Sequence, residues 1–144
     1  MDPLYYRLMK NQYLCPHCRG HLRVGDSIVF RIQNKKKEKG LLLLHPEVGN
    51  YSSIKHPGFN FKEGESLDFH CPICQESLDA KLDKNLVRLI MIDESRTEHE
   101  IYFSRIAGEK STYQVSGGNK VQATGEHSHR YTIFKIPEEL IKYL

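Results

Sequence analysis

The four cysteines of this chain fall in two pairs with the same spacing, CPHC at residues 15–18 and CPIC at residues 71–74. A gap of two residues folds the chain back sharply, so both sulfurs of a pair can bind one ion at about 2.3 Å. The proline after each first cysteine fixes φ and stiffens that turn. The spacing therefore predicts that four thiolates bind a single structural Zn²⁺, namely Cys15, Cys18, Cys71 and Cys74.

The start of the chain favours a reducing compartment, where disulfides are rare. Residues 1–4 (MDPL) do not lead from a basic start into an apolar stretch, so we expect no signal peptide. The longest uncharged apolar run, Leu41–Leu44, is far too short to cross a bilayer. We therefore expect a cytoplasmic protein without a membrane partner. A redox role for the cysteines is an alternative, but thioredoxin-like sites have one CxxC where a strand meets a helix.

The two pairs also share their surroundings. An aromatic residue stands two positions before each first cysteine, and a leucine stands seven positions after it. This frame, aromatic-x-Cys-Pro-x-Cys-x-x-x-Leu, resembles the knuckles of the zinc-ribbon (rubredoxin-like) families. The resemblance implies two similar β arms that face each other across one metal ion, and it implies little about biological role.

Two departures from the family pattern bear on the resemblance. The first knuckle has Gly20 where the family has a knuckle glycine, whereas the second has Glu76. Iron-binding rubredoxins carry glycine directly after the second cysteine, where this chain has Arg19 and Gln75. The resemblance therefore implies zinc, with iron as the alternative.

The 52 residues between Cys18 and Cys71 far exceed the roughly 15–20 of a compact ribbon, so this insertion needs its own structure. Apolar and β-branched residues predict strands at Ser27–Gln33 and Gly40–His45, joined as a hairpin by the polar tip Asn34–Lys39. The punctuated segment His45–Gly64 is expected to be a long loop, followed by a short strand at Ser66–His70.

Past the second pair the pattern predicts an antiparallel meander. The expected strands are Leu86–Asp93, Glu100–Ile106, Thr112–Ser116, Lys120–Thr124 and Tyr131–Ile136, with short helices at the two ends of the chain, through Lys10 and from Pro137. With 27% charged and 39% hydrophobic residues, the composition is that of a globular protein. We therefore expect a mainly β (small α+β) fold, with a zinc-ribbon region at 1–84 and a meander at 85–144, or both fused into one domain. No repeat is visible beyond the two knuckles.

A basic cluster with nearby aromatic residues suggests contact with nucleic acid. Lysines could bind phosphates and aromatic rings could stack on unpaired bases; the candidates are Lys35, Lys36, Lys37, Lys39, Lys55, Lys62, Tyr51, Phe59 and Phe61. The alternative is that these lysines have no binding role and form a solvated hairpin tip. Four thiolates and one Zn²⁺ contribute −4 and +2, which lowers the formal charge from +3 to +1 and leaves a protein partner equally open.

A second metal site is the least favoured hypothesis. His127 and His129 are spaced so that both rings lie on one face of a strand, and His99 or Glu126 could add a third ligand. A metal-dependent hydrolase is therefore an alternative function. The pair lacks a full partner set, so we expect a polar turn at this position and a protein that is not an enzyme.

Overall fold

The computed structural model describes residues 11–117 and 120–128, which form a mainly β fold without an α-helix in those ranges. The predicted terminal helices and the strand Tyr131–Ile136 lie outside the described residues. The strands are β1 (Gln12–Leu14), β2 (Arg23–Val24), β3 (Ser27–Gln33), β4 (Lys39–Leu44), β5 (Ser53–Lys55), β6 (Asp68–His70), β7 (Leu86–Ile92), β8 (Glu98–Ser104), β9 (Thr112–Ser116) and β10 (Lys120–Thr124).

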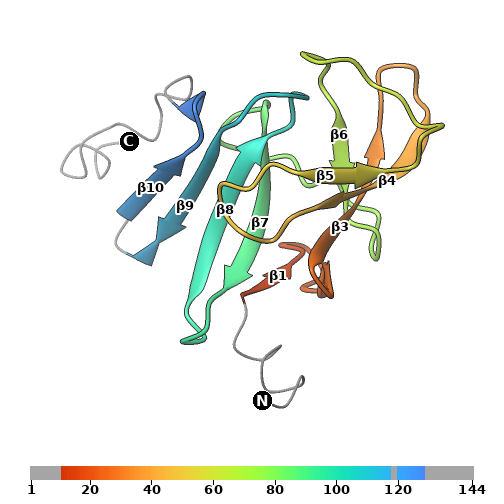
Figure 1. The fold of residues 1–144 in the computed structure, drawn as a ribbon. Helices are drawn as coiled ribbons and strands as arrows, with labels where there is room; N and C mark the ends of the chain where they lie inside the picture. The colour runs from red at the N-terminus through yellow and green to blue at the C-terminus, as the bar shows by residue number, and fades with distance from the viewer. Residues whose placement is uncertain (1–10, 118–119, 129–144) are drawn as a thin grey trace.

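These strands form two antiparallel sheets (Figure 1). Sheet A has the order β1-β7-β8-β9-β10. Sheet B has the order β2-β3-β4-β5, and β6 pairs with the far end of β3. β3, β9 and β10 have the predicted bounds, because each is an alternating β-branched or aromatic run beside a clear turn signal.

The segment His45–Gly64 is not wholly a loop, which corrects the prediction. Its residues Ser53–Lys55 form β5, an edge strand in which Ile54 pairs with Leu43 of β4. A strand of three residues is too short for a period of two to be recognised in the sequence.

The chain contains an internal repeat that extends well beyond the two knuckles, contrary to the expectation from sequence. The first copy is β1, the first knuckle, β3 and β4; the second is β6, the second knuckle, β7 and β8. Positions 27–33 of β3 correspond to positions 86–92 of β7. The hydrogen-bond registers correspond too, since Ile28 pairs with Leu44 as Val87 pairs with Phe103.

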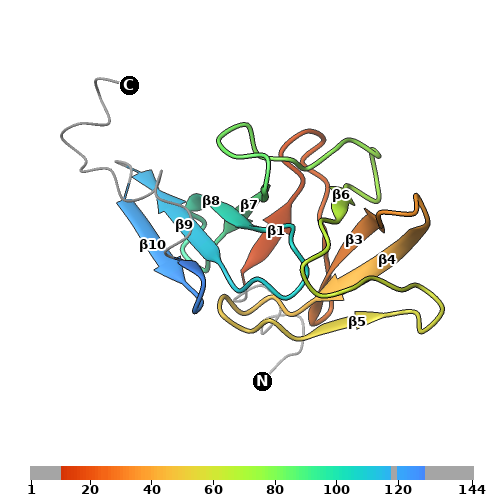
Figure 2. The same ribbon diagram turned by 90° about the horizontal axis from the view of Figure 1, so that it is seen from above.

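Each copy lends its first strand to the other copy. β1 pairs with β7, where Tyr13 lies opposite Met91, and β6 pairs with β3, where Phe69 lies opposite Ile32. β1 consequently lies between β7 and β3 in both views (Figures 1 and 2). The suggested division at residue 84 stays a prediction about independent folding; sheet A and the core both extend across that position.

The main core lies between the two sheets. Its centre is a cluster of three phenylalanines, with Phe30 from β3, Phe69 from β6 and Phe103 from β8. Their ring centroids lie 5.3–5.6 Å apart with the rings strongly inclined to one another, the edge-to-face arrangement that aromatic pairs prefer. A smaller cluster around Tyr102 and Tyr113 covers the other side of sheet A.

The two hairpin turns of the repeat share one device. Asn34 Oδ1 accepts the backbone N–H groups of Lys36 and Glu38, both at 3.0 Å, and Asp93 Oδ1 accepts the equivalent N–H groups of the second turn at 2.9 Å. The residue three positions on has a positive φ in both turns, 67° at Lys37 and 64° at Arg96. A side-chain acceptor at the first position therefore fixes each turn.

We expect Asn34→Ala to lower the free energy of unfolding by about 2 kcal/mol, because two backbone N–H groups lose their acceptor. Asp93→Asn is the matched control: an amide oxygen keeps both backbone contacts of the second turn and the variant loses only the charge that faces His99, so its stability should fall by less than that of Asn34→Ala. Urea denaturation measures both variants. Equal stability of Asn34→Ala and the parent would contradict this account of the turn.

Candidate metal centre

The four cysteine sulfurs form one cluster in which all four atoms lie within 4.8 Å of one another. The closest approaches across the two knuckles are 3.8 Å, from Cys15 Sγ to Cys74 Sγ and from Cys18 Sγ to Cys71 Sγ. Four sulfurs at about 2.3 Å from a tetrahedral ion would lie ~3.8 Å apart. The cluster therefore has the size and the donor set to hold one metal ion.

The backbones of the two knuckles are close copies of each other. The N–H of Cys15 donates to the Gly20 carbonyl and that of Cys71 to the Glu76 carbonyl, both at 3.0 Å. In each knuckle the residue after the second cysteine donates back to the first cysteine's carbonyl, at 2.9 Å in one copy and 3.0 Å in the other. The two knuckles are therefore equivalent, and their sulfurs face each other.

The left-handed position of each knuckle is occupied by Arg19 (φ 58°) and Gln75 (φ 68°). Gly20 and Glu76 both follow that position, and neither has a positive φ. Glycine at position 20 is explained by packing instead. A Cβ there would lie 2.5 Å from Cδ1 of Ile73, which belongs to the opposite knuckle.

Backbone N–H groups point at the sulfurs. His17 N donates to Cys15 Sγ, Ile73 N to Cys71 Sγ and Gly20 N to Cys18 Sγ, each at 3.3 Å. The Gly20 bond lowers the pKa of the Cys18 thiol. Burial raises the pKa of the Cys15 thiol to about 12, so a cation is needed to keep all four groups as thiolates.

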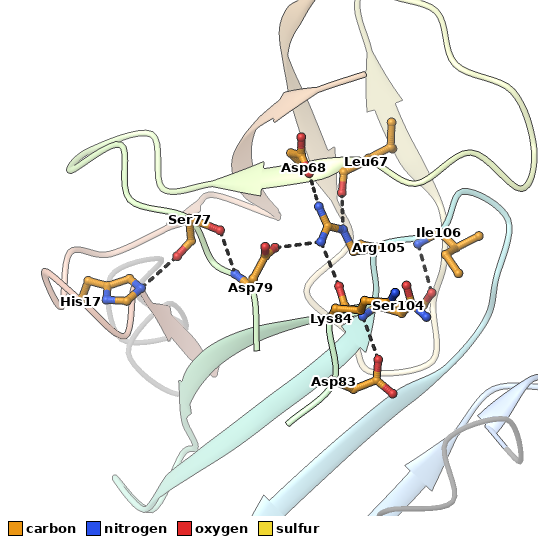
Figure 3. Close-up of polar contacts among 11 residues, drawn as sticks. His17, Leu67, Asp68, Ser77, Asp79, Asp83, Lys84, Ser104, Arg105 and Ile106 are labelled. Carbon is orange, nitrogen blue, oxygen red and sulfur yellow. Dashed lines mark hydrogen bonds and ion pairs between the residues drawn. The ribbon is translucent and has the colours of Figure 1, made fainter. Parts of the chain in front are cut away.

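His17 contacts the segment that follows the second knuckle. Its Nε2 donates to the Ser77 carbonyl at 2.9 Å, and Ser77 Oγ accepts the N–H of Asp79 (Figure 3). The contact links the first knuckle to the segment that follows the second one. His17 thus connects the regions of the two knuckles and is not a member of the sulfur cluster.

Arg105, at the end of β8, holds this region together (Figure 3). It donates to the Leu67 carbonyl at 2.9 Å and to the Lys84 carbonyl at 2.8 Å. Its guanidinium also pairs with the carboxylates of Asp68 and Asp79. The side chain is almost buried, and it connects the start of β6 to the segment before β7. No sequence pattern pointed to this residue.

The suggested nucleic-acid residues separate into two groups. The exposed lysines are Lys35, Lys36, Lys37, Lys39 and Lys62. The other four are buried or half-buried.

Among these, Phe59 is 6% exposed and belongs to the core, and Phe61 packs against that core. Lys55 Nζ donates to the Phe59 carbonyl at 2.7 Å and lies 5.7 Å from the centroid of the Phe61 ring. Tyr51 bonds Thr112 through its hydroxyl at 2.8 Å. The aromatic rings therefore serve the packing of the 51–61 segment.

The HxH segment has a different environment from the cysteines. His127 Nδ1 accepts the N–H of Lys110 at 2.9 Å, and Nε2 lies 3.2 Å from Glu126. His129 lies outside the described residues. Within the described ranges, the four cysteines are the one group of three or more metal-ligating side chains close enough to share an ion.

A serine, a histidine and an aspartate form a hydrogen-bonded chain that the sequence did not reveal. His99 Nε2 lies 2.7 Å from Asp93 Oδ2, and its Nδ1 lies 2.9 Å from Ser116 Oγ. The bond from His99 lowers the pKa of Asp93. These are the residue types of an acyl-transfer triad, but none of them lines the cavity between the sheets. These two hydrogen bonds of His99 connect the β7–β8 turn to β9.

That cavity has a volume of about 230 Å³. Its walls are apolar side chains from both sheets, including the three core phenylalanines, and the segment 45–51 covers one side. Tyr13 fixes that segment through a hydrogen bond from its hydroxyl to the Pro46 carbonyl.

Comparison with protein-family models, with curated proteins and with solved structures gives no significant match in any of the three searches. Within the part of the chain that the structure describes, no helix is long and apolar enough to cross a membrane. The candidate function therefore rests on the geometry of the chain itself.

We expect Cys71→Ser to destabilise both sheets, because β1 and β6 leave the two knuckles for opposite sheets. Bound metal should fall from one equivalent to a small fraction, and amide hydrogen exchange should accelerate across residues 12–14 and 68–70. His17→Ala, a change between two ligands, is the control that keeps its metal. Unchanged exchange across residues 15–74 in Cys71→Ser would contradict a structural role for the site.

Proposed function

We propose that this protein is a zinc-stapled β scaffold, in which one Zn²⁺ bound by Cys15, Cys18, Cys71 and Cys74 holds the two copies of the repeat together. The observation that carries this proposal is the sulfur cluster at the point where β1 and β6 cross between the copies. Four protein ligands close a tetrahedral shell, which is typical of structural sites, whereas catalytic sites keep one position open. Zinc also fits the thiolate set without requiring a redox partner.

Elemental analysis of the purified protein should give one zinc per chain and little iron, since tetrahedral thiolate sites of this spacing favour zinc. Removal of the metal with a chelator should abolish cooperative unfolding, because site formation and folding are coupled in small zinc proteins. A well-folded protein without metal would refute the proposal. One full equivalent of bound iron would identify the metal as iron instead of zinc.

The double variant His127→Ala/His129→Ala serves as the matched control for metal content. It should bind the same single equivalent as the parent, because His127 bonds Lys110 and Glu126 in this fold. Loss of a second equivalent of metal in this variant would instead favour the hydrolase hypothesis.

The scaffold's activity is proposed to be binding, with nucleic acid as the leading partner class. The supporting observation is the β3–β4 turn, where Lys35, Lys36 and Lys37 are exposed on a backbone that the Asn34 side chain fixes. Fixed cations that meet phosphates release counterions and give salt-sensitive affinity. Glu38 and Glu65 lie close to the same turn and moderate its charge.

The second copy of the repeat supplies a natural replacement for this turn. Lys35, Lys36 and Lys37 correspond to Glu94, Ser95 and Arg96, on a backbone with the same hydrogen bonds. The triple variant K35E/K36S/K37R should therefore fold like the parent. Its affinity for single-stranded RNA and the salt dependence of that affinity should both fall, with a slope smaller by about 1.4 in a log–log plot, about 0.7 for each of the two cations lost.

Equal RNA binding by this variant and the parent would count against a nucleic-acid role for the turn. A protein partner is then the better candidate, since the outer face of sheet B carries Leu41 and Ile54 with 53% and 65% of their surface exposed. Both residues project from neighbouring strands on the same side of the sheet.

A further inference from the structure

We propose that the cavity between the two sheets is a binding site for a small neutral molecule with an apolar body and one hydroxyl or carbonyl group. This goes beyond the scaffold role above and depends on a different part of the molecule. The cavity's size, its apolar walls, one unpaired polar atom and the charges of its lining residues support this assignment.

The size and the walls define the body of the ligand. A cavity of about 150 Å³ lined by apolar side chains binds benzene, so about 230 Å³ suits one ring with a short substituent. Phe30, Leu89 and Ile101 contribute apolar wall from both sheets. Such walls make favourable contacts with an apolar ligand body, and they lack the hydrogen-bond partners that a sugar or a nucleotide needs.

Ser111 supplies the polar end. It lines the cavity and is completely buried, and its Oγ has no hydrogen-bond partner among the described residues. A buried hydroxyl without a partner is unfavourable, so a ligand atom that bonds it gains specificity as well as affinity. A hydroxyl can donate or accept, so either an alcohol or a carbonyl group matches it.

The charged groups that line the cavity favour a neutral ligand. The Arg105 guanidinium is already bound by two carboxylates and two carbonyl groups. Lys110 and Glu47 are exposed to solvent and have opposite charges. His45 Nδ1 accepts the N–H of Glu47, which holds that ring in the covering segment. No cation within the described wall is both buried and unpaired, as a carboxylate ligand would require.

Three probes of similar size test the proposal on the intact, metal-loaded chain: benzyl alcohol, toluene and benzoate. Titrations followed by backbone amide shifts in NMR should show saturable binding of benzyl alcohol and toluene at residues that line the cavity, with benzoate weaker than both. Absence of saturable binding of both neutral probes would overturn the proposal.

Two variants identify the site. Ser111→Ala should weaken benzyl alcohol binding by roughly fivefold to tenfold, the worth of one hydrogen bond, and leave toluene unchanged. Leu44→Phe introduces the residue that the second copy carries at the equivalent position, Phe103, and should fill the cavity and abolish binding of both probes. If Leu44→Phe does not fold, Ala107→Val adds bulk at another residue that lines the cavity.

An equal loss of toluene and benzyl alcohol in Ser111→Ala would contradict the assigned polar end. Undiminished binding of both probes in a folded, cavity-filled variant would place the site elsewhere and overturn the proposal. Neither outcome depends on the identity of the metal, so failure here is distinguishable from failure of the zinc proposal.

Discussion

The tetrahedral meeting of four sulfurs is the constraint on which the rest of this fold depends. The two equivalent knuckles face each other, as the two halves of one tetrahedral thiolate site must. The strand before each knuckle pairs in the sheet built by the other copy, with β1 beside β7 and β6 beside β3. The two sheets are thus joined at the sulfur cluster as well as by apolar packing.

The internal repeat separates what the fold requires from what is particular to one copy. Equivalent positions with similar side chains, such as Tyr13 and Phe69 or Leu22 and Leu78, are buried in both copies and serve packing. The copies differ at the turns, where three lysines in the first copy correspond to Glu-Ser-Arg in the second. They also differ at the cavity wall, where Leu44 corresponds to Phe103. Differences on a shared backbone are where a specific activity is expected, because the backbone alone does not demand them.

The clustering of the four cysteines and most long strands were predictable from sequence, since CxxC spacing and strand alternation are local patterns. The repeat was not, because only the knuckle frame keeps its residue types while the hairpins keep backbone geometry with other side chains. Phe59 and Phe61 resembled exposed stacking residues, yet tertiary packing buries the first and half-buries the second. The His99 chain and the cavity join residues from separate strands, so no local pattern could indicate them.

The metal site and the cavity are physically connected through the knuckle arms. Tyr13 and Phe69 each lie two residues before a cysteine ligand, and both line the cavity. Tyr13 also holds the covering segment through Pro46. Release of the metal would therefore loosen two cavity walls and its cover together, while a molecule bound in the cavity would favour the folded state in which the four sulfurs meet. By this linkage, the proposed metal and the proposed cavity ligand would each strengthen the binding of the other without any contact between them.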